Sequence, residues 1–166
     1  MSVYLHTQRL RLEPCQIGNL DAIHRLWMDA DIRQFLFDDR IIALEEAQSF
    51  LEASAESFSQ HGYGLWLMFE QQSPDIAGFS GLLAGSEAAP SLIFGTRPQL
   101  WGRGYAKEAA RAILAYAFDE LGLACVLADV NEPNQASIRV LEALGMSCCR
   151  RAMVNGRPLL YYEIYA

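Results

Sequence analysis

Residues 97–118, RPQLWGRGYAKEAARAILAYAF, constrain the fold most, because two glycines stand one residue apart where the longest helical pattern begins. Gly102 and Gly104 precede an apolar helical periodicity that runs to about residue 121. The first turn of a helix carries amide NH groups without intrahelical partners and about half a positive charge. Glycines at that point let an anion such as a phosphate approach the backbone closely. The stretch therefore predicts a phosphate-binding helix N-terminus.

Two common phosphate-binding loops do not fit this stretch. A dinucleotide-binding fingerprint needs a third glycine where Lys107 stands, and it follows the first strand of a βαβ unit. A P-loop needs Gly-Lys followed by Ser or Thr, whereas Gly104 is followed by Tyr105 and Ala106. Both loops are excluded, so the glycines indicate a cradle of another kind.

Hydrophobic periodicity and turn residues predict strands and helices along the whole chain. Strands are predicted at residues 9–14, at 64–83 as a hairpin, at 91–96 after the loop 84–90, at 124–130, and at 146–166 as a hairpin around Asn-Gly. Helices are predicted at residues 18–30, 44–59, 104–121 and 131–145, with Asn19 as an N-cap and Gly145 as a left-handed residue after the last helix. Because 166 residues with 52% apolar composition suffice for one core, this order predicts a single domain over residues 1–166, an α/β sandwich around a mixed sheet.

Composition excludes several classes of partner. The formal net charge is −7 and basic residues form no run, which excludes nucleic acid as a partner. No apolar stretch approaches the roughly 20 residues that span a bilayer, and the first residues lack the layout of a signal peptide, so we expect a soluble, cytoplasmic protein with no membrane partner. Four cysteines without CxxC spacing predict reduced thiols, and three scattered histidines predict no metal site.

The segment Gln99-Leu100-Trp101-Gly102-Arg103-Gly104 matches the Q/R-x-x-G-x-G/A signature of the GNAT superfamily of acyl-CoA N-acyltransferases. Three further stretches resemble the branch that includes the ribosomal-protein N-terminal acetyltransferases: TQRLRL at 7–12, WGRGYAKEA at 101–109 and NQASIRVLEALGM at 134–146. The likeness covers almost the whole chain. It implies a GNAT-like fold, with a mixed, mostly antiparallel central sheet of about seven strands flanked by four helices.

The resemblance also implies acetyl-CoA as the cosubstrate, with no metal. It places the coenzyme A pyrophosphate on the signature that Gln99 opens, held by NH groups of Gly102, Arg103, Gly104, Tyr105 and Ala106, with positive charge from Arg103 and Lys107. The side chains of Trp101 and Tyr105 are expected to pack under the loop. The main chain of Phe94, Gly95 and Thr96 would pair with the pantetheine amides like an added strand, beside strands parted by a bulge near Gly95.

Asn134 and Ser137 match family positions that reach the pantetheine and the thioester sulfur, although Asn134 also fits simple N-capping. Many members of the superfamily carry a tyrosine acid seven residues after this asparagine, where this chain has Leu141. Ser137 is therefore the candidate catalytic acid, and a thiol with a pKa of about 8.5 needs little help to leave. Ser91 stands where much of the branch has an acidic residue, so the sequence leaves open whether a protein side chain acts as the base.

The acceptor is predicted from the missing base and from charge. An α-amine with a pKa of about 7.7 is roughly one-sixth neutral at pH 7, whereas lysine needs a pKa shift of over about 3 units. Between residues 29 and 56 the net charge is −6, from two arginines, Arg33 and Arg40, and eight acids: Asp29, Asp31, Asp38, Asp39, Glu45, Glu46, Glu52 and Glu56. In the family this region borders the acceptor cleft and would attract a cationic amine, but a solvated helix face is an equal interpretation.

These features predict an N-acetyltransferase of a primary amine, most directly a protein or peptide N-terminal α-amine. A small amine such as a polyamine or an antibiotic is the alternative substrate. A catalytically silent acyl-CoA-binding regulatory module is the alternative class, because the tyrosine and the acidic residue are absent. The chain is expected to be a monomer or a homodimer.

Overall fold

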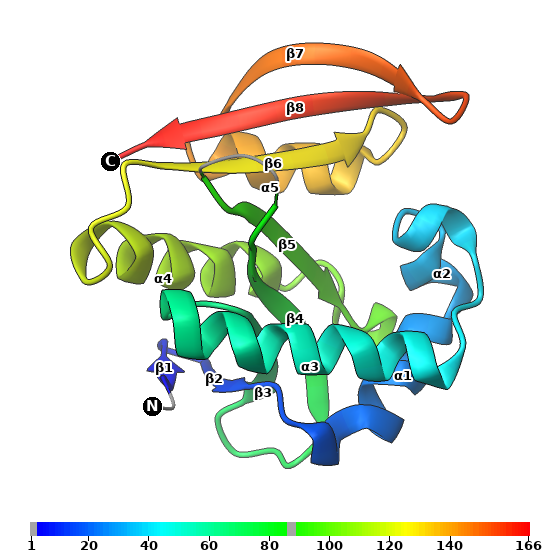
Figure 1. The fold of residues 1–166 in the computed structure, drawn as a ribbon, viewed down its shortest axis with the longest axis vertical. Helices are drawn as coiled ribbons and strands as arrows, with labels where there is room; N and C mark the ends of the chain where they lie inside the picture. Colours follow the sequence, from blue (N-terminus) through cyan, green and yellow to red (C-terminus); the bar gives the residue numbers. More distant parts are fainter. Residues whose placement is uncertain (1–2, 86–88) are drawn as a thin grey trace.

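A computed structural model of the chain describes residues 3–85 and 89–166, except for the side chain of Asp38. Residues 86–88, within the predicted loop 84–90, lie outside the described residues. The described residues form one sheet of eight strands in the order β1-β2-β3-β4-β5-β6-β8-β7 (Figure 1). The strands are β1 (Leu5–His6), β2 (Leu10–Pro14), β3 (Leu65–Glu70), β4 (Ile76–Leu83), β5 (Ser91–Thr96), β6 (Cys125–Asn131), β7 (Ser147–Val154) and β8 (Arg157–Tyr165). Every neighbouring pair is antiparallel except β5 and β6, which run parallel.

Helices cover both faces of this sheet, as alternate residues of β3 show. Leu65 and Leu67 belong to a buried cluster with α1 (Leu20–Met28), α2 (Ala30–Arg33) and α3 (Leu44–His61). Trp66 and Met68, which point to the opposite face, pack in a larger cluster with α4 (Tyr105–Asp119) and α5 (Gln135–Ala143). Three short 3₁₀ turns, η1 (Ile17–Asn19), η2 (Phe37–Asp39) and η3 (Pro98–Leu100), connect the larger elements. The site described below therefore lies in a layered α/β fold.

The predicted fold class is confirmed, and each predicted strand and helix is present. The two-residue β1 and the four-residue α2 were not predicted, and they raise the described elements to eight strands and five α-helices. Asn155 and Gly156 both adopt positive φ, 52° and 76°, as a tight turn between β7 and β8 requires. Gly145 has φ 90° after α5, as predicted. No helix in the described part of the chain has the length and apolarity that crossing a bilayer requires.

Asn19 does not cap α1 with its side chain, so that prediction is wrong in detail. Asn19 occupies the N-cap position, but its Oδ1 accepts a hydrogen bond from the NH of Gln16, at 2.8 Å. The side chain therefore stabilises the preceding turn η1 instead of the first turn of the helix.

The parallel strands β5 and β6 separate almost as soon as they meet. Ser91 and Leu127 are the one registered pair, and the NH of Leu127 donates to Pro90 at 2.9 Å. Beyond this pair β5 runs away from β6 at a wide angle (Figure 1). The bulge expected near Gly95 is absent, because β4 and β5 pair without a register shift from Leu83–Ser91 to Gly78–Thr96. The gap therefore arises between two regular strands.

Candidate functional site

The glycines before α4 form an open, left-handed loop. Gly102 has φ 81° and Gly104, the N-cap of α4, has φ 79°. A Cβ at Gly102 would meet no heavy atom within 4 Å, and one at Gly104 would meet only Nη2 of Arg9, at 3.6 Å. These positions need glycine for their backbone conformation, and the space beside them is free for a ligand.

The first turn of α4 presents NH groups without partners inside the helix. The first bond of the helix joins the NH of Glu108 to the carbonyl of Gly104, at 3.0 Å. The NH groups of Tyr105, Ala106 and Lys107 precede it and have no intrahelical acceptor. Lys107 is exposed at this turn. The arrangement suits an anion of the size of a phosphate, as the sequence predicts.

Two other predicted cofactor residues lie beside this turn. Arg103 is half-exposed, and its Nη1 lies 3.8 Å from a carboxylate oxygen of Glu70, at the end of β3. Gln99 is exposed in η3, the short turn that leads into the glycine loop. The cation of Arg103 is therefore available at the loop, although Glu70 partly offsets it.

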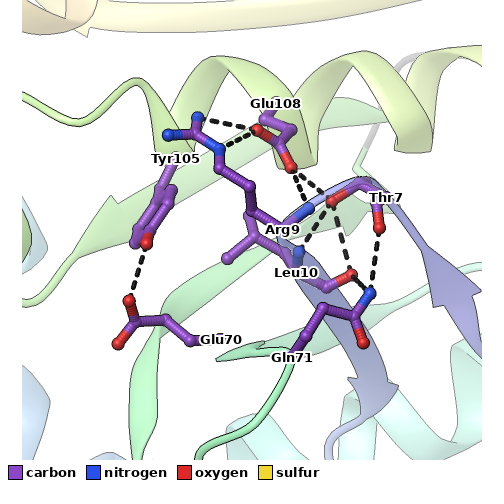
Figure 2. Close-up of polar contacts among 7 residues, drawn as sticks. All are labelled: Thr7, Arg9, Leu10, Glu70, Gln71, Tyr105 and Glu108. Carbon is purple, nitrogen blue, oxygen red and sulfur yellow. Dashed lines mark hydrogen bonds and ion pairs between the residues drawn. The ribbon is translucent and has the colours of Figure 1, made fainter.

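A polar cluster fixes the first turn of α4 to the N-terminal strands (Figure 2). Glu108 accepts hydrogen bonds from Oγ1 of Thr7 at 2.5 Å, from the NH of Arg9 at 3.0 Å and from Nε of Arg9 at 2.7 Å. The Arg9 guanidinium also lies over the ring of Tyr105, 4.7 Å from its centroid. Burial alone would raise the pKa of Glu108, but the hydrogen bonds from Thr7 and Arg9 outweigh it and lower that pKa. The TQRLRL and WGRGYAKEA stretches thus meet in one contact.

The side chains of Tyr105 and Trp101 both have structural partners. Tyr105 is buried, and its hydroxyl donates to Glu70 at 2.6 Å. Nε1 of Trp101 donates to the carbonyl of Thr96 at 2.6 Å, while its ring stays exposed. Tyr105 therefore packs as predicted. The packing predicted for Trp101 is wrong, because its ring is exposed and only Nε1 ties the glycine loop to the end of β5.

Along β5, alternate residues turn their main chain toward the gap. The NH of Arg97 donates to the carbonyl of Ala77, the residue before Gly78 in β4. In an antiparallel ladder every second residue bonds to the neighbouring strand, so the main-chain NH and C=O of Gly95 also point at β4. Phe94 and Thr96 direct theirs toward the gap, where the carbonyl of Thr96 is taken by Trp101. A Cβ at Gly95 would lie 2.6 Å from the ring of Phe79. Gly95 is thus needed for packing, and Phe94 and Thr96 carry the groups that a pantetheine amide would reach.

A cavity of about 310 Å³ occupies the gap between β5 and β6 and is lined in part by Asn134, Ser137 and Leu141 of α5. Oδ1 of Asn134 accepts the NH of Ser137 at 3.2 Å, so the N-capping interpretation is confirmed. Leu141 is 1% exposed in the wall of this cavity, where many relatives in the superfamily would have the tyrosine acid. The structure therefore brings the predicted acid Ser137 to the gap.

Asp129 of β6 also lines this cavity, and the sequence analysis missed it. Asp129 is an exposed residue, yet desolvation by its neighbours in the recess raises the pKa of its carboxyl. Its carboxylate makes no ion pair or hydrogen bond with other described residues. Asp129 lies two residues beyond Leu127, the partner of Ser91. It therefore supplies a carboxylate close to Ser91, the position at which the family resemblance implies an acid and this chain has a serine. A single acid within the apolar strand ACVLADV was the available signal.

The described acidic side chains of residues 29–56 do not line the cavity. Asp29 accepts from the NH of Asp31 as a helix cap, and Glu46 pairs with Arg40 at 3.0 Å. The acids on α3 are otherwise exposed. Among acids of this region with described side chains, none lines the cavity, whose wall here is Phe35, Leu36 and Phe37. This arrangement favours the interpretation of a solvated helix face.

A helix terminus with unpartnered NH groups, beside a gap between parallel strands, suits an extended, phosphate-bearing ligand. The chain belongs to the GNAT acetyltransferase family, since the family model described as an acetyltransferase (GNAT) domain matches residues 9–147. Within residues 3–85 and 89–166, no cluster of three or more histidine, cysteine or acidic side chains is arranged to hold a metal ion.

One similar relative is the FsC-acetyl coenzyme A-N(2)-transacetylase of Aspergillus fumigatus, 31% identical over 155 residues that cover 86% of this chain and 64% of that protein. The chain thus spans less than two thirds of that relative's length. An acetyltransferase structure from Agrobacterium tumefaciens aligns with TM-score 0.85 and 22% identity, over 99% of this chain and 95% of that one. The ribosomal L7/L12 alpha-N-protein acetyltransferase RimL, in complex with coenzyme A, aligns with TM-score 0.84 and 16% identity, over 98% of both chains. These two structures show a shared fold.

Proposed function

We propose that this protein transfers an acetyl group from acetyl-CoA to a primary amine. One observation carries the proposal: the amide groups before α4, the free edge of β5 and the side chains of Asp129 and Ser137 surround a single gap in the sheet. The glycine loop has open space for a pyrophosphate, and the unpaired NH groups with Arg103 and Lys107 suit its charge. The residues present therefore fit coenzyme A, and the resemblance and the family point to the same ligand.

Bound acetyl-CoA supplies an activated thioester carbonyl. Asp129 holds the acceptor ammonium in the cavity and accepts a proton from it, so that a neutral amine is presented to the gap. The raised pKa of Asp129 makes its carboxylate a stronger base than a fully hydrated one. NH groups at the edge of β5 are available to donate to the carbonyl oxygen. Ser137 or a water molecule donates a proton to the departing sulfur.

The acceptor we propose is the α-amine of a protein or peptide. Its pKa of about 7.7 lies within reach of a single carboxylate base, whereas a lysine amine at about 10.4 is far harder to deprotonate. RimL, which shares the fold, acts by its description on a protein α-amine. A small amine is the second candidate, since the relative from Aspergillus fumigatus is named as an N(2)-transacetylase. Two proton-transfer groups in one cavity favour an enzyme over a silent binding module.

Turnover tests the proposal. Purified protein is incubated with acetyl-CoA and a panel of peptides, amino acid amides and polyamines, and free thiol is followed over time. We expect at least one amine to release thiol well above the hydrolytic background, with the acetylated amine confirmed by mass spectrometry. Tight binding of coenzyme A without release of thiol by any amine would favour the silent module, and no binding in calorimetry would reject the ligand itself.

A further inference from the structure

A second cavity, of about 230 Å³, lies between the sheet and the helices α1 and α3. Its walls are mainly apolar and include Trp27, Phe50 and Leu65. Ala53 of α3 and Ala84 after β4 also line it, and both are exposed, so the cavity opens to solvent beside α3. Apolar cavities of about 150 Å³ bind a benzene ring, so this one has room for an aromatic or branched aliphatic group.

The second cavity adjoins the proposed catalytic cavity. Phe37, Leu83 and Ile93 line both of them. Phe37 packs edge-on against Trp27 at 5.4 Å and against Phe50 at 5.2 Å between ring centroids. The backbone of Phe37 has φ 55°, a left-handed conformation that bulky residues rarely adopt and that concentrates at ligand-binding sites. An aromatic side chain in an unusual conformation thus lies where the two cavities adjoin.

The wall of the second cavity also holds a polar group without a partner. Trp27 is 1% exposed, and its Nε1 has no hydrogen-bond acceptor among the described residues. Buried donors are nearly always paired, with ordered water among their partners, so a water molecule, a peptide carbonyl or a hydroxyl could accept from this one.

We propose that the second cavity binds an apolar side chain of the acceptor amine, aromatic or branched aliphatic, and so selects amines by the group next to the reacting nitrogen. This inference rests on the proposed function. A group of the acceptor is favoured because this cavity shares Phe37, Leu83 and Ile93 with the cavity that Asp129 lines, where the amine is proposed to bind. The substrate class is therefore an α-amine whose residue is apolar, such as a phenylalanine or leucine amide.

A paired substrate series tests the inference. With acetyl-CoA fixed, kcat/KM is measured for glycine, alanine, leucine and phenylalanine amides, and then the acyl chain is lengthened from acetyl to hexanoyl with one amine fixed. Each buried methylene contributes roughly fourfold, so leucine and phenylalanine amides should exceed glycine amide by at least about thirtyfold. Longer acyl chains should bring no comparable gain.

Matched variants locate the effect. Ala53→Phe places a ring at the mouth of the cavity, and Ala55→Phe places the same ring at an exposed site of α3 that does not line it. We expect Ala53→Phe to remove most of the preference for leucine and phenylalanine amides and to leave glycine amide turnover nearly unchanged, while Ala55→Phe behaves as wild type.

Three results would overturn the inference. Equal kcat/KM across the amides would refute the pocket and leave the transferase intact, and a preference that follows the acyl chain would assign the cavity to the thioester instead. Equal effects of the two variants would place the selective group elsewhere. If no amine releases thiol at all, the proposed function fails first, and this inference fails with it.

Discussion

Replacing Asp129 with asparagine tests the proton acceptor that the structure adds to the site. The change keeps the shape of the side chain and removes its charge, and Asp129 has no hydrogen bond or ion pair with the described residues to lose. No other carboxylate lines the cavity among the described side chains, so no neighbour can replace it. We therefore expect a folded variant with a specific defect in proton transfer.

The size of the defect separates two mechanisms. An α-amine is about one-sixth neutral at pH 7, so a carboxylate that only shifts this ionisation contributes at most about sixfold. A base that accepts the proton during the reaction contributes roughly 10²- to 10⁴-fold. We expect Asp129→Asn to lower kcat/KM for an α-amine by about a hundredfold at pH 7, with coenzyme A affinity unchanged.

The pH dependence gives a second readout. Desolvation raises the pKa of Asp129, so its carboxylate is present above that raised value and wild-type activity falls as the pH drops through it. The asparagine variant should lack this acid limb and should gain activity with rising pH until the amine is neutral, near about 7.7. Steady-state thiol release from pH 5 to 9 measures both profiles, with Asp75→Asn, an exposed carboxylate in a remote turn, as the matched control. A loss below about sixfold, or an unchanged acid limb, would refute Asp129 as the base.

Three further predictions concern the cradle, its anchor and the acid. Gly104→Val should weaken coenzyme A binding at least about tenfold in calorimetry, because position 104 has a left-handed conformation that β-branched residues avoid. Gly18→Ala, at a site with open space and no positive φ, should leave the affinity unchanged. Equal affinities of the two variants would reject the cradle. Glu108→Gln should lower the free energy of unfolding by about 1–3 kcal/mol at pH 7. Because the pKa of Glu108 is lowered in the folded state, the wild type keeps this stabilisation at pH values above the ordinary pKa of about 4.3. It loses the stabilisation as the pH falls through the folded-state pKa, so the denaturant midpoints of the two proteins should converge in acid. A constant difference between the midpoints would contradict this. Ser137→Ala should lower kcat by about tenfold with little change in coenzyme A binding, since a thiol leaves readily, and an equal rate would assign the proton to water.

Local sequence pattern was sufficient to predict most elements of the fold, though not the short β1 and α2. The periodicity of α3 and α4, the Asn-Gly turn at residues 155–156 and the glycine after α5 each depend on neighbours in sequence, and each was predicted. The side-chain oxygen of Asn19 accepts a hydrogen bond at the turn η1 and not from α1. A turn and a helix that share one residue compete for the same oxygen.

Contacts between distant segments could not be predicted from the sequence. Asp129 is a single acid within an apolar strand, and its place at the cavity depends on the separation of β5 and β6 beyond a single residue pair. The same holds for Phe37, whose position between two cavities follows from the packing of α1 and α3. Gly95 was predicted to lie at a bulge, but no bulge exists there. A glycine is needed at this position because the ring of Phe79 leaves no room for a Cβ.

The contact between Glu108 and the N-terminal strands joins residues 99 to 101 positions apart. A ligand that orders the first turn of α4 is thereby coupled to the strand pairing at the beginning of the chain, and the coupling must act equally in both directions. Saturation with coenzyme A should consequently slow amide hydrogen exchange at residues 7–12. Loosening of those first strands, by mutation or by acid, should in turn reduce the affinity for coenzyme A before the core itself unfolds.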